Sequence, residues 1–91
     1  MPAVATKLRA GAVVLEHGER MDWHSTKRRE ELLIALGGCL SLELRPSARA
    51  GSRRVSLAAG QCAWLPPRTT HRVVNRSATR ARYIYVTAPV R

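Results

Sequence analysis

The stretch EELLIALGGCLSLEL (residues 30–44) decides the fold that we expect. Its apolar residues form two runs of strand length, and Gly37 and Gly38 separate them. Short apolar runs bounded by glycine are typical of strands, whereas a helix needs a longer segment with a 3.6-residue period. We therefore predict two antiparallel strands joined as a hairpin at the two glycines.

The rest of the chain repeats this pattern. Runs rich in Val, Ile, Leu, Tyr and Thr predict strands over residues 10–18, 20–25, 30–36, 39–45, 53–59, 61–67, 71–75 and 80–88. Turn residues separate them at Gly18, Gly37-Gly38, Pro46 to Gly51, Gly60, Pro66-Pro67 and Asn75 to Ser77. Short strands at regular spacing, without a helical stripe, predict an all-β sandwich or barrel.

The run ELLIAL is apolar on both of its alternating sides. Leu32 and Ile34 form one side, and Leu33 and Ala35 form the other. Because a strand of a small barrel has one side facing the core, the second apolar side needs a cover. Two alternatives stay open: a second copy of the chain, giving a homodimer, or an N-terminal strand of the same chain.

Size and charge narrow the classes of function. The 91 residues fit a single domain over 1–91, and the formal net charge is +10. The arginines are spread along the chain, and their densest group, RPSARAGSRR (residues 45–54), has no aromatic residue to stack on bases. Nucleic-acid binding is therefore disfavoured. The excess of arginine equally suits solubility or the attraction of an anionic small molecule.

Targeting signals and cysteine motifs are absent from the sequence. No apolar segment approaches the roughly 20 residues that span a bilayer, and Lys7, Arg9 and Gly11 interrupt the N-terminal segment. We therefore expect a cytoplasmic protein that does not enter a membrane. Cys39 and Cys62 lack the close spacing of zinc or redox motifs, so we expect them to be small apolar fillers.

Two spaced patterns contain the residues suited to chemistry. The first is Gly18, five residues, His24, one residue, Thr26, three residues, Glu30, six residues, Gly37. The second is Gly60, five residues, Pro66, four residues, His71, three residues, Asn75. On a strand, positions 24 and 26 face the same side, Glu30 follows a turn, and His71 belongs to a third strand. Imidazole and carboxylate groups are metal ligands.

Both spacings resemble the two motifs of the cupin family, G(X)5HXH(X)3-4E(X)6G and G(X)5PXG(X)2H(X)3N, over residues 18–75. The resemblance implies a double-stranded β-helix, or jelly-roll, barrel of the small single-domain bacterial kind. It also implies a divalent metal site with His24, Glu30 and His71 as ligands. Thr26 stands in place of the family's second histidine, and Arg68 in place of a glycine.

Two imidazoles and one carboxylate leave coordination positions open. Non-haem Fe(II) oxygenases use this arrangement, and Zn(II) with a water is satisfied by the same trio, so Fe, Zn, Mn and Ni all stay open. We expect the Thr26 hydroxyl to bond a water at the metal or Glu30, and Trp64, rather than Tyr83 or Tyr85, to line the pocket. Glu31 faces outward if Glu30 faces inward, so the ligand depends on register.

The resemblance leaves the reaction open, because cupins include dioxygenases, isomerases, epimerases, lyases and non-catalytic binders. One hypothesis is a metal-dependent enzyme acting on a small anionic organic molecule, with an arginine near the mouth pairing with its carboxylate. Arg72 should face outward and is not that arginine, and His17 should be an exposed histidine outside the site. The alternative is a barrel that binds a metabolite without catalysis, or that has lost the metal.

Overall fold

The computed structural model describes residues 7–45, 49 and 51–90, and these residues form strands and turns without a helix. No helix in this part of the chain is long and apolar enough to cross a membrane. Each of the eight predicted runs overlaps one strand, whereas most of the predicted turn over 46–51 lies outside the described residues. The strands are β1 (Arg9–Leu15), β2 (His24–Ser25), β3 (Arg29–Gly37), β4 (Cys39–Arg45), β5 (Arg53–Ala58), β6 (Cys62–Leu65), β7 (Thr70–Val74) and β8 (Ala81–Pro89).

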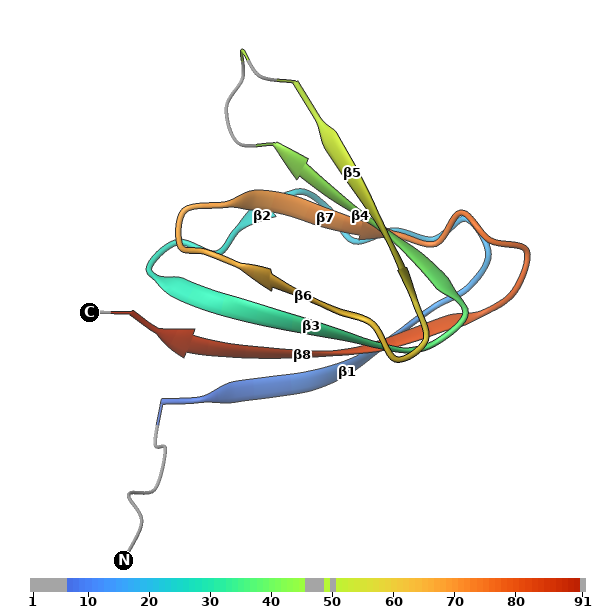
Figure 1. Cartoon of the computed structure of the whole chain (residues 1–91), viewed down its shortest axis with the longest axis horizontal. Coiled ribbons are helices and arrows are strands. Elements are labelled where there is room, and N and C mark those ends of the chain that lie inside the picture. The colour runs from blue at the N-terminus through green and yellow to red at the C-terminus, as the bar shows by residue number, and fades with distance from the viewer. Residues whose placement is uncertain (1–6, 46–48, 50, 91) are drawn as a thin grey trace, which may run out of the picture.

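The strands form two antiparallel sheets of four strands each (Figure 1). One sheet has the order β1-β8-β3-β6, and the other has the order β2-β7-β4-β5. Apart from the consecutive strands β4 and β5, neighbours in each sheet come from distant parts of the chain, which is the connectivity of a jelly roll. The predicted all-β jelly-roll barrel is confirmed.

The predicted hairpin over residues 30–44 is wrong. The strand β3 pairs with β6 and β8 in one sheet, whereas β4 pairs with β5 and β7 in the other. Gly37 and Gly38 therefore lie at a corner where the chain passes between the sheets. The two runs can belong to different sheets because each has its own side facing the core. Leu33 and Ala35 form this side on β3, and Leu40 and Leu42 form it on β4.

Gly38 explains why this corner is made with glycine. Its φ is 75°, in the left-handed region that residues with a side chain rarely adopt. A Cβ atom at this position would lie 2.6 Å from the carbonyl oxygen of Arg80 and 2.8 Å from Cα of Ala81. The corner thus needs both the backbone freedom and the small size of glycine.

The hydrophobic core lies between the two sheets. Leucines on β3, β4, β5 and β6 contribute most of the large apolar side chains, and β7 and β8 add a valine, an alanine and a tyrosine. The buried set is Leu15, Leu33, Ala35, Leu40, Leu42, Leu57, Leu65, Val73, Ala81 and Tyr83. Polar side chains that point into the same space are therefore removed from bulk water.

The outer faces of the two sheets differ. On the β1-β8-β3-β6 sheet, Leu32 and Ile34 face away from the core opposite Val86 and Ile84 of β8, and all four stay partly exposed. The strand β1 pairs with the edge of β8 instead of lying across this face, so among the described residues no N-terminal strand provides the cover. The outer face of the other sheet carries serine, glutamate and arginine side chains.

Candidate metal centre

Two histidines meet on neighbouring strands of one sheet. His24 of β2 lies directly opposite His71 of β7 in the strand register. Directly opposed residues of an antiparallel pair have adjacent side chains, and the two ring centroids are 4.2 Å apart with an interplanar angle of 57°. His71 is fully buried, whereas His24 is exposed at the open side of the barrel.

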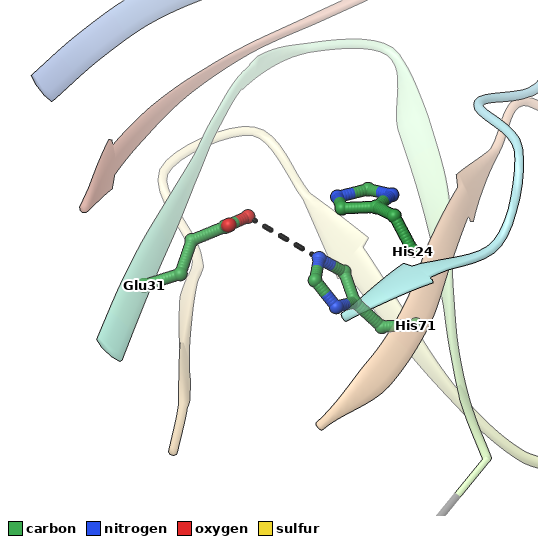
Figure 2. A group of neighbouring side chains, drawn as sticks. All are labelled: His24, Glu31 and His71. Atoms are coloured by element: carbon green, nitrogen blue, oxygen red, sulfur yellow. Dashed lines mark ion pairs between the residues drawn. The ribbon is translucent and has the colours of Figure 1, made fainter. Parts of the chain in front are cut away.

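The third member of the group comes from the facing sheet. Glu31 of β3 is 8% exposed and reaches across the barrel, so that its Oε2 lies 3.4 Å from Nε2 of His71 (Figure 2). Each of His24, Glu31 and His71 offers a potential ligand atom, and these three atoms lie within 4.8 Å of one another. Three strands from both sheets thus converge on one small volume.

The expectation that Glu30 faces the interior is wrong. Its carboxylate lies on the outer side of the sheet, where Oε1 accepts a hydrogen bond of 2.8 Å from Nε1 of Trp64. Successive strand residues face opposite sides, and Glu31 shares its side with the buried Leu33 and Ala35. The sequence could not decide the register, because both sides of this strand are apolar.

The hydrogen bonds of the two imidazoles define which nitrogen is available. Nδ1 of His24 lies 2.9 Å from the carbonyl oxygen of Asp22, and Nδ1 of His71 lies 3.0 Å from that of Thr69. A carbonyl only accepts, so each Nδ1 carries a proton, and Nε2 is the ring nitrogen that can bind a metal. Metal-binding histidines are commonly oriented in this way.

Nε2 of His71 is buried and has no hydrogen-bond partner among the described residues. It faces the Glu31 carboxylate, so two lone-pair donors lie 3.4 Å apart. When Nε2 carries no proton, these two groups repel unless a cation lies between them. This donor set therefore fits a divalent metal ion, and it is orphaned without a cation.

The distances between the three potential ligand atoms also fit a metal ion if these atoms move slightly closer together. Two ligands that each lie about 2.1 Å from one metal ion are at most about 4.2 Å apart, a few tenths of an ångström less than the present limit of 4.8 Å. His24, Glu31 and His71 are the residues that would hold the metal.

Thr26 does not have the role expected for it. Its hydroxyl donates to the carbonyl of Pro66 (2.7 Å) and accepts from the amide of Thr69 (3.0 Å). Because its only proton is used, Thr26 cannot also donate to a water at the metal. Its contribution is indirect, since it fixes Thr69, whose carbonyl orients the His71 ring.

A cavity of about 350 Å³ is lined by two of the three candidate ligands, His24 and Glu31. Met21 and Val73 form part of its apolar wall, and Tyr83 and Tyr85 form another part. Trp64 was expected here, but it lies on the outer face of the sheet and is 60% exposed. The tyrosine pair was the alternative indicated by alternation along the strand, and the structure places that pair at the cavity.

Tyr83 is a protonated hydroxyl beside the site. Burial, followed by the charge of Glu31 and the proximity of Tyr85, raises the pKa of Tyr83 to about 12. Tyr85 occupies space that exists because β1 has glycine opposite it. A Cβ atom on Gly11 would lie 2.6 Å from the Tyr85 hydroxyl oxygen and 2.7 Å from its ring.

Two arginines line the same cavity. Arg9 comes from β1 and Arg29 from β3. Arg29 is held in place by Thr87, whose hydroxyl oxygen accepts from Nε at 2.9 Å and whose carbonyl accepts from Nη2 at 3.0 Å. The guanidinium is thus oriented before any ligand binds.

Of the remaining predictions about single residues, those for Arg72 and His17 are confirmed and that for the two cysteines is wrong. Arg72 faces outward, as predicted, and its Nε donates to Glu43 at 2.8 Å. His17 is exposed, as predicted, with Nδ1 2.6 Å from the carbonyl of Ser77. Cys39 and Cys62 are free and exposed, so the prediction that they fill the core is wrong.

Arg68 shows why the family pattern has glycine at its position. Its φ is 57°, in the left-handed region where glycine is favoured. The turn nevertheless forms, and the amide of Arg68 donates to the carbonyl of Lys27 at 2.8 Å. This bond ties the loop before His71 to the loop after His24, so the substitution does not separate the two histidines.

Comparison with known proteins agrees with this architecture. The sequence model of one family, described as Cupin domain, matches residues 11–87. A search of curated proteins found no match. Among solved structures, the protein TT1209 from Thermus thermophilus aligns with a TM-score of 0.80 and 25% identity, over 96% of this chain and 77% of that one.

Two further structures extend the comparison. A Cupin 2 conserved barrel domain protein from Salinispora arenicola CNS-205 has a TM-score of 0.78 and 23% identity, over 99% of this chain and 70% of that one. A recombinant oxalate oxidase in complex with glycolate has a TM-score of 0.82 and 18% identity, over 91% of this chain and 42% of that one. The chain spans about half the length of several structures that it matches.

Proposed function

Because the chain belongs to the cupin family, we propose that it binds a divalent metal ion through His24, Glu31 and His71 and receives a small anionic organic molecule in the adjoining cavity. The observation that carries this proposal is the buried, unpartnered Nε2 of His71, which faces the Glu31 carboxylate. A divalent cation satisfies both groups at once, and the exposed His24 completes the set.

The charge around the cavity supports an anionic ligand. Arg9 and Arg29 line it, and the guanidinium of Arg29 is already oriented by Thr87. Its Nε and Nη2 already donate to Thr87 and Lys7, so Nη1 is the donor that remains to pair with a carboxylate. The oxalate oxidase that shares this fold was solved with glycolate, a small hydroxy acid anion. Ligands of this class are the first to test.

The side chains suggest how such a ligand would be held. A bound divalent ion supplies a Lewis acid that polarises an oxygen of the ligand. Arg29 would hold a carboxylate, Tyr83 would donate a hydrogen bond because its hydroxyl stays protonated, and Tyr85 would limit the cavity laterally. We propose an oxygenase, isomerase or lyase type of reaction, with non-catalytic binding of the same ligand as the alternative.

Metal analysis tests the site. Protein prepared without a nickel column and reconstituted with Fe(II), Zn(II), Mn(II) or Ni(II) should bind one ion per chain. His24→Ala and His71→Ala should lower this stoichiometry, whereas His17→Ala is the matched control and should not. Equal metal content in all four proteins would contradict the assignment.

A ligand panel then separates an enzyme from a binder. Small hydroxy and keto acids should raise the melting temperature of the metal-loaded protein, and Arg29→Met should remove this shift. Turnover that disappears with Glu31→Gln favours the enzyme, and binding without turnover across the panel favours the binder. A panel that produces no shift in the wild-type protein would contradict the proposed ligand class.

We also propose that a second copy of the chain covers the apolar outer face of the β1-β8-β3-β6 sheet. Leu32, Ile34, Ile84 and Val86 lie at its centre, and Val14 is 52% exposed at its edge. Sedimentation should give a dimer at micromolar concentration. Val14→Lys should shift it toward monomer, unlike Val55→Lys on the other sheet. A wild-type monomer would exclude the dimer.

A further inference from the structure

A second pocket lies on the outer face of the β2-β7-β4-β5 sheet, outside the barrel interior. Its volume is about 240 Å³. Ser41 of β4 and Ser56 of β5 are direct neighbours in the strand register and form part of its lining. Ser77, Arg54, Arg76 and Cys39 also line it. None of these residues belongs to the candidate metal centre.

Ser41 is an unusual residue for this position. It alternates with the core residues Leu40 and Leu42, so its side chain is directed to the outer face, yet it is only 6% exposed. Its hydroxyl oxygen is buried and has no hydrogen-bond partner among the described residues. A buried hydroxyl without a partner is unfavourable. A ligand in the pocket would give this hydroxyl an acceptor.

The charge beside the pocket determines the kind of ligand. Arg54, Arg72 and Arg76 all contact the carboxylate of Glu43, so three positive charges surround one negative charge. Arg76 uses Nη2 for this contact, and Arg54 uses Nε at 3.8 Å. Their other guanidinium nitrogens make no hydrogen bond within the described part of the chain. Two cationic groups with unused donors therefore flank the Ser41 hydroxyl.

We propose that this outer-face pocket binds a small oxyanion, namely a phosphate group, through the Ser41 hydroxyl and the unused donors of Arg54 and Arg76. A phosphate offers several acceptor oxygens and matches guanidinium geometry. Glu43 lies behind the two arginines and holds them in position, and it does not line the pocket. The phosphate group belongs either to inorganic phosphate or to a small phosphomonoester.

Cys39 provides a local probe of this pocket, because it lines the pocket and its thiol is free and exposed. In a Cys62→Ser background, the rate of Cys39 alkylation by iodoacetamide should fall as inorganic phosphate or glycerol phosphate is added. The ligand that protects at lower concentration identifies the source of the phosphate group. Sodium chloride at matched ionic strength is the control for screening.

Ser41→Ala should weaken this protection about tenfold or more, since it removes a hydrogen bond to a charged group. Without phosphate the same variant should be as stable as the parent or more stable, because the hydroxyl has no partner to lose. His71→Ala should protect like the parent, which separates this pocket from the metal centre.

Three results would overturn the proposal. One is protection no greater than that given by chloride. Another is protection of Ser41→Ala at the same phosphate concentration as the parent. The third is a single-stranded oligonucleotide protecting far better than either small phosphate, because that would indicate a general polyanion surface.

Discussion

Two regions of the molecule share an unusual feature and differ in the charge around it. Among the described residues, the buried polar side-chain atoms without a hydrogen-bond partner are Nε2 of His71, inside the barrel, and Oγ of Ser41, on the outer face of the same sheet. The histidine nitrogen faces the carboxylate of Glu31. The serine hydroxyl lies in a pocket lined by Arg54 and Arg76.

This difference teaches that an unsatisfied atom indicates a ligand and that its neighbours indicate the sign of that ligand's charge. A lone pair beside a carboxylate is satisfied by a cation, whereas a hydroxyl proton beside guanidinium groups is satisfied by an anion. One sheet thus carries a candidate cation site on its inner face and a candidate anion site on its outer face.

The largest effect expected from a conservative change is on the interior region. Glu31→Gln removes the charge that faces His71, and divalent metal affinity should fall by more than about 100-fold, the upper end of the loss caused by changes around the ligands. Glu30→Gln, one residue away on the opposite side of β3, is the matched control. Isothermal titration with Zn(II) compares them, and equal affinities would contradict the assigned register.

Gly11→Ala tests the wall of the interior cavity. The added Cβ would lie 2.6 to 2.7 Å from Tyr85, so overpacking should lower the free energy of unfolding by about 3 kcal/mol. Urea denaturation measures this loss. In a Tyr85→Ala background the same substitution should cost much less, and an unchanged cost there would show that Tyr85 is not the obstacle.

Thr26→Val tests the support of the histidine. It leaves the Thr69 amide and the Pro66 carbonyl without their bonds to the hydroxyl, which should cost about 2 kcal/mol of unfolding free energy. Thr26→Ser should recover most of it. The metal stoichiometry should stay at one ion in both variants, and a loss of the ion with valine but not serine would show that the Thr26 hydroxyl contributes directly at the metal.

Glu43→Gln is expected to have the smallest effect, and it concerns the outer region. The side-chain hydrogen bond from Arg76, together with contacts from Arg72, holds the pKa of Glu43 below its usual value of 4.5. A lowered folded-state pKa stabilises the protein above the unfolded pKa, and this contribution is lost as the pH falls through the folded pKa.

Glu43→Gln should therefore lower stability by about 1 kcal/mol at pH 7, because the arginines are partly exposed. The difference from wild type should shrink below pH 4.5. Urea titrations at pH 7 and pH 3 measure it. A constant difference across that range would show that the carboxylate charge is not the stabilising feature.

The sequence predicted the fold class and the meeting of the two histidines, because both follow from local patterns of residues. Eight short apolar runs predicted the strands, and the motif spacing brought His24 and His71 together. The sequence did not predict the features that depend on which distant strands pair with each other. The double glycine at Gly37 and Gly38 suits a hairpin equally well, and only the positions of β6, β8, β5 and β7 show that it joins two sheets.

The register of β3 was undetermined for a related reason. Leu32 and Leu33 are both apolar, so the hydrophobic pattern could not show which of Glu30 and Glu31 faces inward, and motif spacing selected Glu30. The structure shows Glu31 with the buried side. The orphaned Ser41 hydroxyl has no sequence signature, because Arg54 and Arg76 join it in the pocket from other parts of the chain.

The most direct measurement of the central claim is the nitrogen NMR spectrum of the three histidine rings during titration with Zn(II). The account predicts that the Nε2 resonances of His24 and His71 shift to metal-bound values while their Nδ1 atoms keep their protons, and that His17 does not change. Rings of His24 and His71 that stay unshifted at saturating zinc would contradict it.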